Sequence, residues 1–444
     1  MTVAIVKRLA IIGGGPGGLA AARVFLKNAP NFEIDLFERD RTVGGLWHYG
    51  DQKRQGSPMY DHLETNISKH IMKFSGFPFP EKVPTYPWRK DVFEYLKSYS
   101  EKFLENEDRV RILLNHRVDS LSKKGSVWSL VSHNNVDNKD SRKEYDYVVV
   151  ANGHHHEPRL PQNVTGLDQW FENGAAFCAR DFQNCKFAQG KNVVVVGNGS
   201  SGSDILNQVS TVAHKLYHSV RNPEEVAKTT GYPQLDILTT VPKITSVDWQ
   251  TRSVNLENGE TIKNVDYLVY ATGYLYSLPF FEPTLRADLL GGPSKTSAAR
   301  VHNLWKQIFY VKDPTLAFAL LPQLIVPFPL AELQAALMVK AFNGDLQVPA
   351  KSDDELDPEL AKKQPAYHPI PDFKDLDYYN ELQSILDTAG GAKDPLQPVK
   401  WDETYQQMRI TSTSDKQKRN IILTKHAKES RAQNKPYELI KFSL

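Results

Sequence analysis

Two segments of the same glycine-rich pattern, Gly-x-Gly-x-x-Gly, begin 184 residues apart in this 444-residue chain, at positions 13 and 197. A single copy can mark a tight turn alone, but each copy here follows an apolar run and precedes a stretch with helical spacing. That strand, turn and helix context is typical of a phosphate-binding loop for a dinucleotide. Parallel strands need helical crossovers, so we expect an α/β fold with two Rossmann-like domains. The residues concerned are Gly13, Gly14, Gly15, Pro16, Gly17 and Gly18 in the first copy, and Gly197, Gly199, Ser200, Ser201 and Gly202 in the second.

The surroundings of the first copy predict which dinucleotide it binds. Residues 9–12 form an apolar strand-like run, residues 19–27 read as a helix, and residues 33–37 read as the next strand. Glu38 ends that strand, twenty residues past Gly18. A carboxylate at this place accepts hydrogen bonds from an unphosphorylated ribose, so the first site is predicted to bind FAD or NAD.

The second copy differs at its ribose position. It follows the run at residues 193–196, and Arg221 stands nineteen residues beyond Gly202, after a strand-like run at residues 215–218. A guanidinium there suits a ribose 2′-phosphate, which predicts NADP. The alternative is that Arg221 is only a solvated arginine at a strand end.

The order of these motifs suggests that one domain is inserted into the other. Two further runs, at residues 147–150 and 267–270, resemble each other, and each is followed by a small residue and glycine. We therefore predict a discontinuous FAD-binding domain at residues 1–166 and 278–444, interrupted by an NADPH-binding domain at residues 167–277.

Charge and cysteine content limit the partners and the compartment. With 54 basic and 52 acidic residues the net charge is +2, which gives no footprint for nucleic acid. The two cysteines, Cys178 and Cys185, lack the spacing of a redox dithiol and are too few for a disulfide scaffold. No metal-ligand motif stands out, and the sequence does not indicate an oligomeric state.

Nothing in the sequence predicts a membrane span or a leader. Residues 314–331 are uncharged but contain four prolines, so we expect buried loop and strand there. Lys7 and Arg8 interrupt the first apolar run, which argues against a signal peptide. The basic stretch at residues 415–444 is interpreted as a solvated surface helix and tail. A cytoplasmic protein is expected, with peripheral association with the endoplasmic reticulum left open.

Other motifs join the two glycine loops, and the chain as a whole resembles the flavin-containing monooxygenases, most closely their soluble fungal members. The resemblance runs nearly end to end. It is carried by Gly44-Gly45-Leu46-Trp47, by Thr65-Asn66, by the segments at residues 74–78 and 199–204, by Ala271-Thr272-Gly273-Tyr274, and by Glu332-Leu333-Gln334-Ala335.

The resemblance implies roles for individual residues. Asn66 would be the active-site amide, although an Asx-type turn is an alternative role for it. Without the resemblance, Trp47 would read as core packing and Gln334 as a solvated helix residue. The FAD-binding residues implied are Glu38, Leu46, Trp47, Thr65, Asn66, Val118 and Gln334, and the NADPH-binding residues are Ser201, Gly202, Ser203, Asp204 and Arg221.

One part of the family pattern is missing. The family has a phenylalanine, a glycine, a histidine and an aromatic residue where this chain has Glu172, Gly174, Cys178 and Phe182. The departure puts domain positioning and NADPH handling in doubt more than the reaction class. Cys178 could be a reactive thiol, but a small buried hydrophobe is the preferred interpretation.

The resemblance implies an NADPH-dependent flavin monooxygenase that uses O₂, forms a C4a-hydroperoxyflavin and oxygenates a soft nucleophile. Small thiols such as glutathione, cysteine and cysteamine are the preferred substrates. The alternatives are N- or S-oxygenation of amines or thioethers, Baeyer-Villiger oxygenation of ketones, and a non-catalytic sensor that binds FAD and NADPH. A pyridine-nucleotide disulfide reductase would need a close cysteine pair, which the chain lacks.

Overall fold

A computed structural model describes residues 6–50, 56–229, 232–293, 295–362 and 367–440. The chain forms two compact units. The first contains Met1–His48, Ile67–Glu157 and Leu275–Ile410, and the second contains Tyr49–Asn66, Pro158–Tyr274 and Thr411–Leu444. The segments at residues 49–66 and 411–444 thus lie in the second unit, whereas the sequence placed them with residues 1–166 and 278–444. The assignment of one cofactor to each domain stays a prediction.

The first unit is built on a seven-stranded sheet of order β19-β20-β21-β7-β1-β2-β3. Strands β21, β7, β1, β2 and β3 are parallel, and β20 and β19 extend the edge in antiparallel fashion. The central strands are buried and apolar because helices and a second sheet cover them. The bounds are β1 Lys7–Ile12, β2 Phe32–Phe37, β3 Val110–Leu113, β7 Tyr147–Val150, β19 Leu304–Trp305, β20 Phe309–Tyr310 and β21 Leu316–Phe318.

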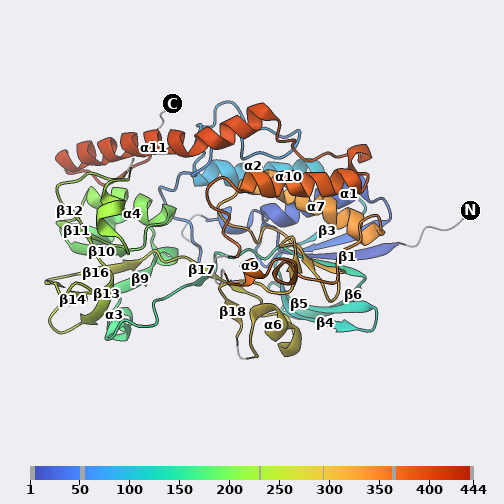
Figure 1. Cartoon of the computed structure of the whole chain (residues 1–444), viewed down its shortest axis with the longest axis horizontal. Coiled ribbons are helices and arrows are strands. Elements are labelled where there is room, and N and C mark those ends of the chain that lie inside the picture. Colours follow the sequence, from blue (N-terminus) through green and yellow to red (C-terminus); the bar gives the residue numbers. More distant parts are fainter. Residues whose placement is uncertain (1–5, 51–55, 230–231, 294, 363–366, 441–444) are drawn as a thin grey trace, which may run out of the picture. The chain divides into compact units, whose positions relative to one another are not determined.

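Helices cover one face of this sheet and an antiparallel meander covers the other (Figure 1). Helix α1 is buried from Gly17 to Leu26 and packs against α7, which is buried along nearly its whole length. These two helices form the centre of the largest apolar cluster. The elements are α1 Pro16–Asn28, α2 Arg89–Phe103, α6 Pro283–Leu290, α7 Pro327–Asn343, α8 Asp353–Leu356, α9 Pro358–Lys362, α10 Asp375–Thr388, η1 Gly45–Trp47, η4 Gly391–Lys393, and the meander β4 His116–Lys124, β5 Val127–Asn134 and β6 Lys139–Tyr145.

The second unit has its own parallel sheet of five strands, in the order β12-β11-β10-β16-β9. A small antiparallel sheet, β13-β14-β15, belongs to the same unit. The elements are α3 Leu167–Glu172, α4 Ser200–Ser210, α5 Pro223–Ala227, η2 Ala179–Asp181, η3 Cys185–Ala188, β9 Ala176–Cys178, β10 Asn192–Val196, β11 Lys215–Ser219, β12 Leu238–Val241, β13 Ile244–Asp248, β14 Ser253–Leu256, β15 Thr261–Ile262 and β16 Tyr267–Tyr270.

Two features complete the topology. A three-stranded sheet of β8 Glu157–Pro158, β17 Tyr274–Ser277 and β18 Ser297–Ala298 lies where the chain changes units. The long helix α11, Glu403–Ala432, follows, and its residues from Thr411 onward belong to the second unit. The predicted α/β class with two parallel, Rossmann-like sheets is confirmed.

Two local predictions are wrong. Loop and strand were expected through residue 331, but α7 begins at Pro327, because the first turn of a helix does not use the N–H that proline lacks. Helix α11 is not merely solvated, since Leu423 and Ala427 on it are buried. Among the described residues, no helix is both long enough and apolar enough to cross a lipid bilayer.

Candidate dinucleotide sites

The first glycine loop turns the chain from β1 into α1. Gly13 has a φ of +112°, which L side chains rarely adopt, and a Cβ there would lie 2.4 Å from the carbonyl oxygen of Ala151. Gly18 lies in the first turn of α1, where a Cβ would lie 1.9 Å from the carbonyl oxygen of Gly13. The first glycine therefore permits the turn, and the last permits close packing of the helix on the loop.

The middle glycine of this loop faces no side chain. Gly15 is the N-cap residue of α1, and a Cβ there would meet only the Cα of Gly45, at 3.6 Å. The N–H groups in the first turn of a helix have no intrahelical partner, and the helix dipole favours an anion beside them. The pyrophosphate of a dinucleotide fits this cradle because no side chain fills it.

Glu38 follows β2 and lies beside the same loop. The residue is buried, and its Oε2 accepts a hydrogen bond of 2.8 Å from the N–H of Gly14. Its Oε1 accepts one of 2.9 Å from the N–H of Asp40. Because a carboxylate oxygen has two lone pairs, it can accept a second hydrogen bond, such as one from a ribose hydroxyl. This geometry fits a ribose that carries no 2′-phosphate.

The segment with Leu46 and Trp47 lies against this loop. The N–H of Gly44 donates a hydrogen bond of 2.8 Å to the carbonyl oxygen of Gly14, and both Leu46 and Trp47 are half-buried in η1. Val118, the residue predicted to lie near the adenine, is half-buried in β4 and packs on the cluster that contains Phe37. These three residues thus belong to the same unit as the first loop.

Gln334 is fully buried in α7, so it is not a solvated helix residue. Its Oε1 accepts a hydrogen bond of 2.9 Å from the N–H of Leu320, and its Nε2 donates one of 3.4 Å to the hydroxyl of Tyr378. Leu320 has a φ of +57°, an unusual conformation for a branched residue. A Cβ on Gly17 would lie 3.5 Å from the side chain of Leu320. Gln334 therefore supports a strained segment that lies beside the first glycine loop.

The second glycine loop repeats this construction in the second unit. Gly197 has a φ of +109°, and a Cβ there would lie 2.4 Å from the carbonyl oxygen of Ala271. A Cβ on Gly202 would lie 2.2 Å from the carbonyl oxygen of Gly197, whereas nothing lies within 4 Å of one on Gly199. The predicted serines line the start of α4: Ser200 is exposed, and Ser201 and Ser203 are half-buried.

The ribose position of the second site is one residue earlier than the sequence spacing suggested. The N–H of Gly13 donates to the carbonyl oxygen of Phe37, and the N–H of Gly197 donates to that of Ser219. Ser219 therefore matches Phe37, and Val220 rather than Arg221 stands at the level of Glu38. The two-residue difference in helix length, 13 residues in α1 and 11 in α4, explains the error.

This correction strengthens the case for a phosphorylated ribose. Buried Val220 leaves no carboxylate at the ribose position to repel a 2′-phosphate. Arg221 follows at once, is exposed, and forms no hydrogen bond or ion pair with any residue that the structure describes. An available guanidinium next to an uncharged ribose position suits NADPH.

Asp204, predicted to hold NADPH, is engaged within the protein. Its Oδ2 accepts a hydrogen bond of 2.5 Å from the hydroxyl of Tyr60 and one of 3.2 Å from Nε2 of Gln208. Burial raises the pKa of Asp204 to about 6, although the bond from Tyr60 and the charge of Lys416 oppose the shift. The structure thus ties the helix α4 to the segment that precedes Asn66.

Asn66 is exposed at the end of that segment, and Thr65 before it is buried. Sequence reasoning missed the residues that hold it. Glu64 is buried and pairs with Arg419, itself only 2% exposed, and Nζ of Lys416 donates to the carbonyl oxygen of Thr65 at 3.0 Å. Their separation of more than 350 residues leaves no local signal, because only a basic helix was visible near the end of the sequence.

Cys178 is buried at the end of β9, which confirms the preferred interpretation of a small buried hydrophobe. It does not form a disulfide with Cys185. Its strand is the edge of the five-stranded sheet, paired in parallel with β16. The position of the missing family histidine is therefore packed into the second unit's sheet.

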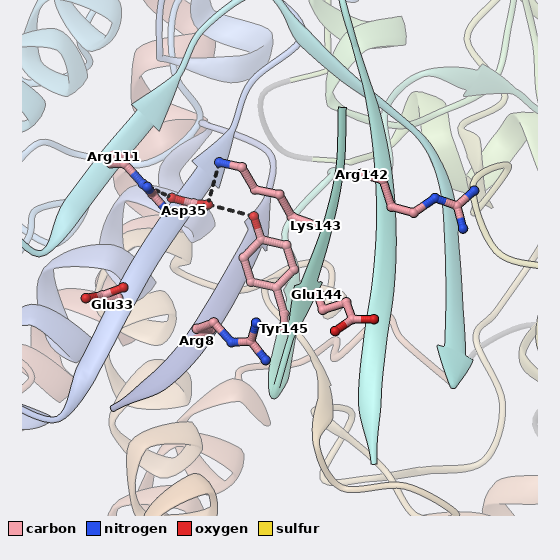
Figure 2. Close-up of a pocket in the computed structure, with 8 residues that line it drawn as sticks. All are labelled: Arg8, Glu33, Asp35, Arg111, Arg142, Lys143, Glu144 and Tyr145. Atoms are coloured by element: carbon pink, nitrogen blue, oxygen red, sulfur yellow. Dashed lines mark hydrogen bonds and ion pairs between the residues drawn. The ribbon is translucent and has the colours of Figure 1, made fainter. Parts of the chain in front are cut away.

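A charged hollow of about 420 Å³ lies on the first unit away from the glycine loop (Figure 2). Its centre is buried Asp35 of β2, which binds the guanidinium of Arg111 at 2.6 Å and the hydroxyl of Tyr145 at 2.6 Å. Lys143 lies 3.4 Å from the same carboxylate. The central carboxylate is already bound by two cations and a hydroxyl, so we interpret the hollow as the contact between the sheet and the meander rather than as a cofactor site.

Comparisons with known proteins agree with this geometry. The model of the flavin-binding monooxygenase-like family matches residues 6–246 and 232–388. The thiol-specific monooxygenase of Saccharomyces cerevisiae (strain ATCC 204508 / S288c) is 47% identical over 442 residues, 99% of each chain. The flavin-containing monooxygenase FMO GS-OX-like 2 of Arabidopsis thaliana is 28% identical, over 85% of this chain and 84% of that protein. The solved structure of S-allyl-L-cysteine S-oxygenase from Allium sativum shares the fold, with a TM-score of 0.76 and 23% identity over 97% of this chain and 99% of that one.

Proposed function

The chain belongs to the flavin-binding monooxygenase-like family, and from that premise we propose that it uses FAD, NADPH and O₂ to oxygenate small thiols. Flavin-dependent, NADPH-dependent monooxygenation is the activity of the family. The finer statement, that the substrate is a thiol such as cysteamine, cysteine or glutathione, is supported by the 47% identity to a thiol-specific monooxygenase over 99% of the chain.

The two sites divide the cofactors between the units. In the first unit, the cradle at Gly15 and the buried carboxylate of Glu38 would hold the pyrophosphate and the ribose of FAD, with Leu46, Trp47 and Val118 nearby. In the second unit, the loop around Gly199 and the guanidinium of Arg221 would hold NADPH. The contrast between Glu38 and the Val220-Arg221 pair is the observation that carries this division.

The proposed reaction needs no metal and no catalytic triad. Bound FAD would accept a hydride from NADPH and activate O₂, so the hard chemistry belongs to the cofactor. One oxygen atom goes to the sulfur of a thiol as a sulfenic acid and the other leaves as water, while NADPH and a proton are consumed. A second thiol displaces water from the sulfenic acid and forms a disulfide. Two thiols, O₂, NADPH and a proton thus give one disulfide, two waters and NADP⁺.

The protein's own groups position the reactants and limit the side reaction that releases hydrogen peroxide. We assign the amide of Asn66 to hydrogen bonding at the reacting centre, in keeping with its exposed position beside buried Thr65. Exclusion of water favours transfer of oxygen to the substrate over its loss as peroxide. A cytoplasmic location and association with the endoplasmic reticulum stay predictions.

A substrate panel tests the thiol proposal. The purified protein with bound FAD is supplied with NADPH, O₂ and, in turn, cysteamine, glutathione, a thioether, a tertiary amine and a cyclic ketone. NADPH oxidation, oxygen uptake, disulfide and peroxide are measured together. We expect thiols to give the highest kcat/KM and about one disulfide per NADPH. A higher kcat/KM for the thioether, the amine or the ketone would overturn the thiol assignment while leaving the monooxygenase class in place.

A further inference from the structure

Two helices of the second unit hold the segment at residues 60–66, which carries Asn66. Helix α4 supplies the first set of contacts. The hydroxyl of Tyr60 donates to Asp204 at 2.5 Å, and Nε2 of Gln208 donates to the carbonyl oxygen of His62 at 3.2 Å. The proposed NADPH helix therefore binds the start and the middle of this segment directly.

Helix α11 supplies the second set, at the end of the segment nearest Asn66. Nη2 of Arg419 donates to Oε2 of Glu64 at 2.6 Å, and its Nε lies 3.1 and 3.2 Å from the two carboxylate oxygens. Nζ of Lys416 donates to Oε1 of Glu64 at 2.9 Å and to the carbonyl oxygen of Thr65 at 3.0 Å. One acidic side chain and two cations thus fix the two residues that precede Asn66.

Burial makes this arrangement costly as a source of stability alone. The side chains of Glu64 and Arg419 are 4% and 2% exposed, and a buried ion pair is often no more stabilising than apolar residues of the same size. Such a pair instead imposes a fixed geometry, because the forked guanidinium accepts few orientations of the carboxylate. The amide of Asn66 makes no hydrogen bond to a residue that the structure describes. Its place is therefore set through the backbone that Glu64 and Thr65 anchor.

We propose that Glu64, held by Lys416 and Arg419 of α11, is a positioning residue for the Asn66 amide, so that the last helix of the chain sets the coupling of NADPH oxidation to substrate oxygenation. The inference rests on the role proposed above for Asn66. When the anchor loosens, NADPH, O₂ and a proton yield NADP⁺ and hydrogen peroxide in place of oxygenated substrate. Helix α11 thereby acts by positioning Asn66 and not by contact with the reactants.

Lys416 offers the mildest test, because the pair between Arg419 and Glu64 stays in place without it. Lys416→Met removes the bonds to Glu64 and Thr65, and Lys416→Arg keeps a cation on a side chain of similar length. Lys418→Met on the same helix is the matched control, since Lys418 is exposed and, among the described residues, pairs only with Asp415, at 3.0 Å. Peroxide formed per NADPH is measured with cysteamine, along with FAD content and the KM for NADPH.

We expect Lys416→Met to raise the peroxide fraction at least about threefold, with FAD content and the KM for NADPH within about twofold of wild type. Lys416→Arg restores coupling, and Lys418→Met matches wild type. A wild-type peroxide fraction in Lys416→Met overturns the inference, as does a rise of equal size in Lys418→Met or no rescue by arginine. Asn66→Ala separates the two claims. If Asn66→Ala forms more peroxide per NADPH and Lys416→Met does not, only the positioning role of Glu64 fails. If Asn66→Ala forms no more peroxide than wild type, the role proposed for Asn66 itself is contradicted.

Discussion

The two glycine loops have the same backbone but opposite surroundings. Helix α1 is buried along most of its length under α7, and the carboxylate of Glu38 already accepts two backbone N–H groups. Helix α4 starts with exposed Ser200, and Arg221 is an exposed cation without a protein partner among the described residues. The first loop is preorganised inside a core, as suits a cofactor that stays bound. The second presents the guanidinium of Arg221 to solvent, as would suit a coenzyme that must enter and leave.

The strongest test of the difference between the two loops is to add the same methyl group to each of them. Gly13→Ala and Gly197→Ala each place a Cβ 2.4 Å from a carbonyl oxygen at a left-handed φ, which we expect to cost about 3 kcal/mol or more locally. Gly13→Ala should yield protein without FAD. Gly197→Ala should keep FAD but lose reduction by NADPH more than about 100-fold, or about 2.7 kcal/mol or more.

The pair is measured by flavin absorbance per chain and by the anaerobic rate of flavin reduction. Each variant serves as the control for the other. Loss of FAD from both, or from neither, would contradict the assignment of one dinucleotide to each unit.

The next prediction compares helices α1 and α4 through the pH dependence of the free energy of unfolding. Asp204 on α4 has a pKa raised to about 6 by burial, from 3.8, whereas the matching position on α1 is the apolar Ala20. Because the folded state holds the proton more tightly, the contribution of Asp204 to the free energy of unfolding is full below pH 3.8 and is lost as pH rises through 6. The free energy of unfolding of Asp204→Asn should not show this loss. Between pH 4 and pH 7 the free energy of unfolding of wild type should fall relative to Asp204→Asn by about 2–3 kcal/mol.

Denaturant melts of the second unit's transition at several pH values measure that difference. Asp266→Asn, which removes a half-buried carboxylate that pairs with Lys191 and accepts from the N–H of Asn192, is the control. If the difference in the free energy of unfolding between wild type and Asp204→Asn does not change with pH, the pKa of Asp204 is not raised in the folded protein.

The smallest effect concerns the ribose residues. Arg221→Ala should raise the KM for NADPH by about 10- to 100-fold, equivalent to about 1.4–2.7 kcal/mol, and leave the KM for NADH within about twofold. Val220→Asp places a carboxylate at the level of Glu38 and should shift preference toward NADH. Arg39, one residue past Glu38, is the counterpart of Arg221 in the first unit, so Arg39→Ala is the matched control. Equal losses with both coenzymes in Arg221→Ala would refute a 2′-phosphate contact.

The parts of the sites that were predictable are those encoded over short spans. The strand, the glycines and Glu38 follow one another within about thirty residues, and the structure brings them together at one loop. The same counting matched Arg221 with Glu38, whereas Val220 stands at that level in the structure, because α4 is two residues shorter than α1 and a spacing rule does not register the difference. Roles for Asn66, Leu46 and Trp47 came from resemblance and stay predictions.

Polar contacts between residues far apart in the chain could not be predicted from the sequence. The pairing of Glu64 with Arg419 spans 355 residues, and arginine is rarely buried, so the sequence alone favours a solvated basic helix. Gln334 posed a similar problem, since an amide on a helix gives no sign that it will bond to Leu320. Only the packed fold decides which polar residues of an amphipathic helix face inward.

The most direct test of the central claim is an anaerobic titration of the purified protein with NADPH while the flavin absorbance is recorded. The account predicts one FAD per chain that survives gel filtration and is bleached by one equivalent of NADPH, with NADH far less effective. Protein that carries no flavin, or flavin that NADPH does not reduce, would contradict the assignment of a bound FAD to the first unit and an exchangeable NADPH to the second.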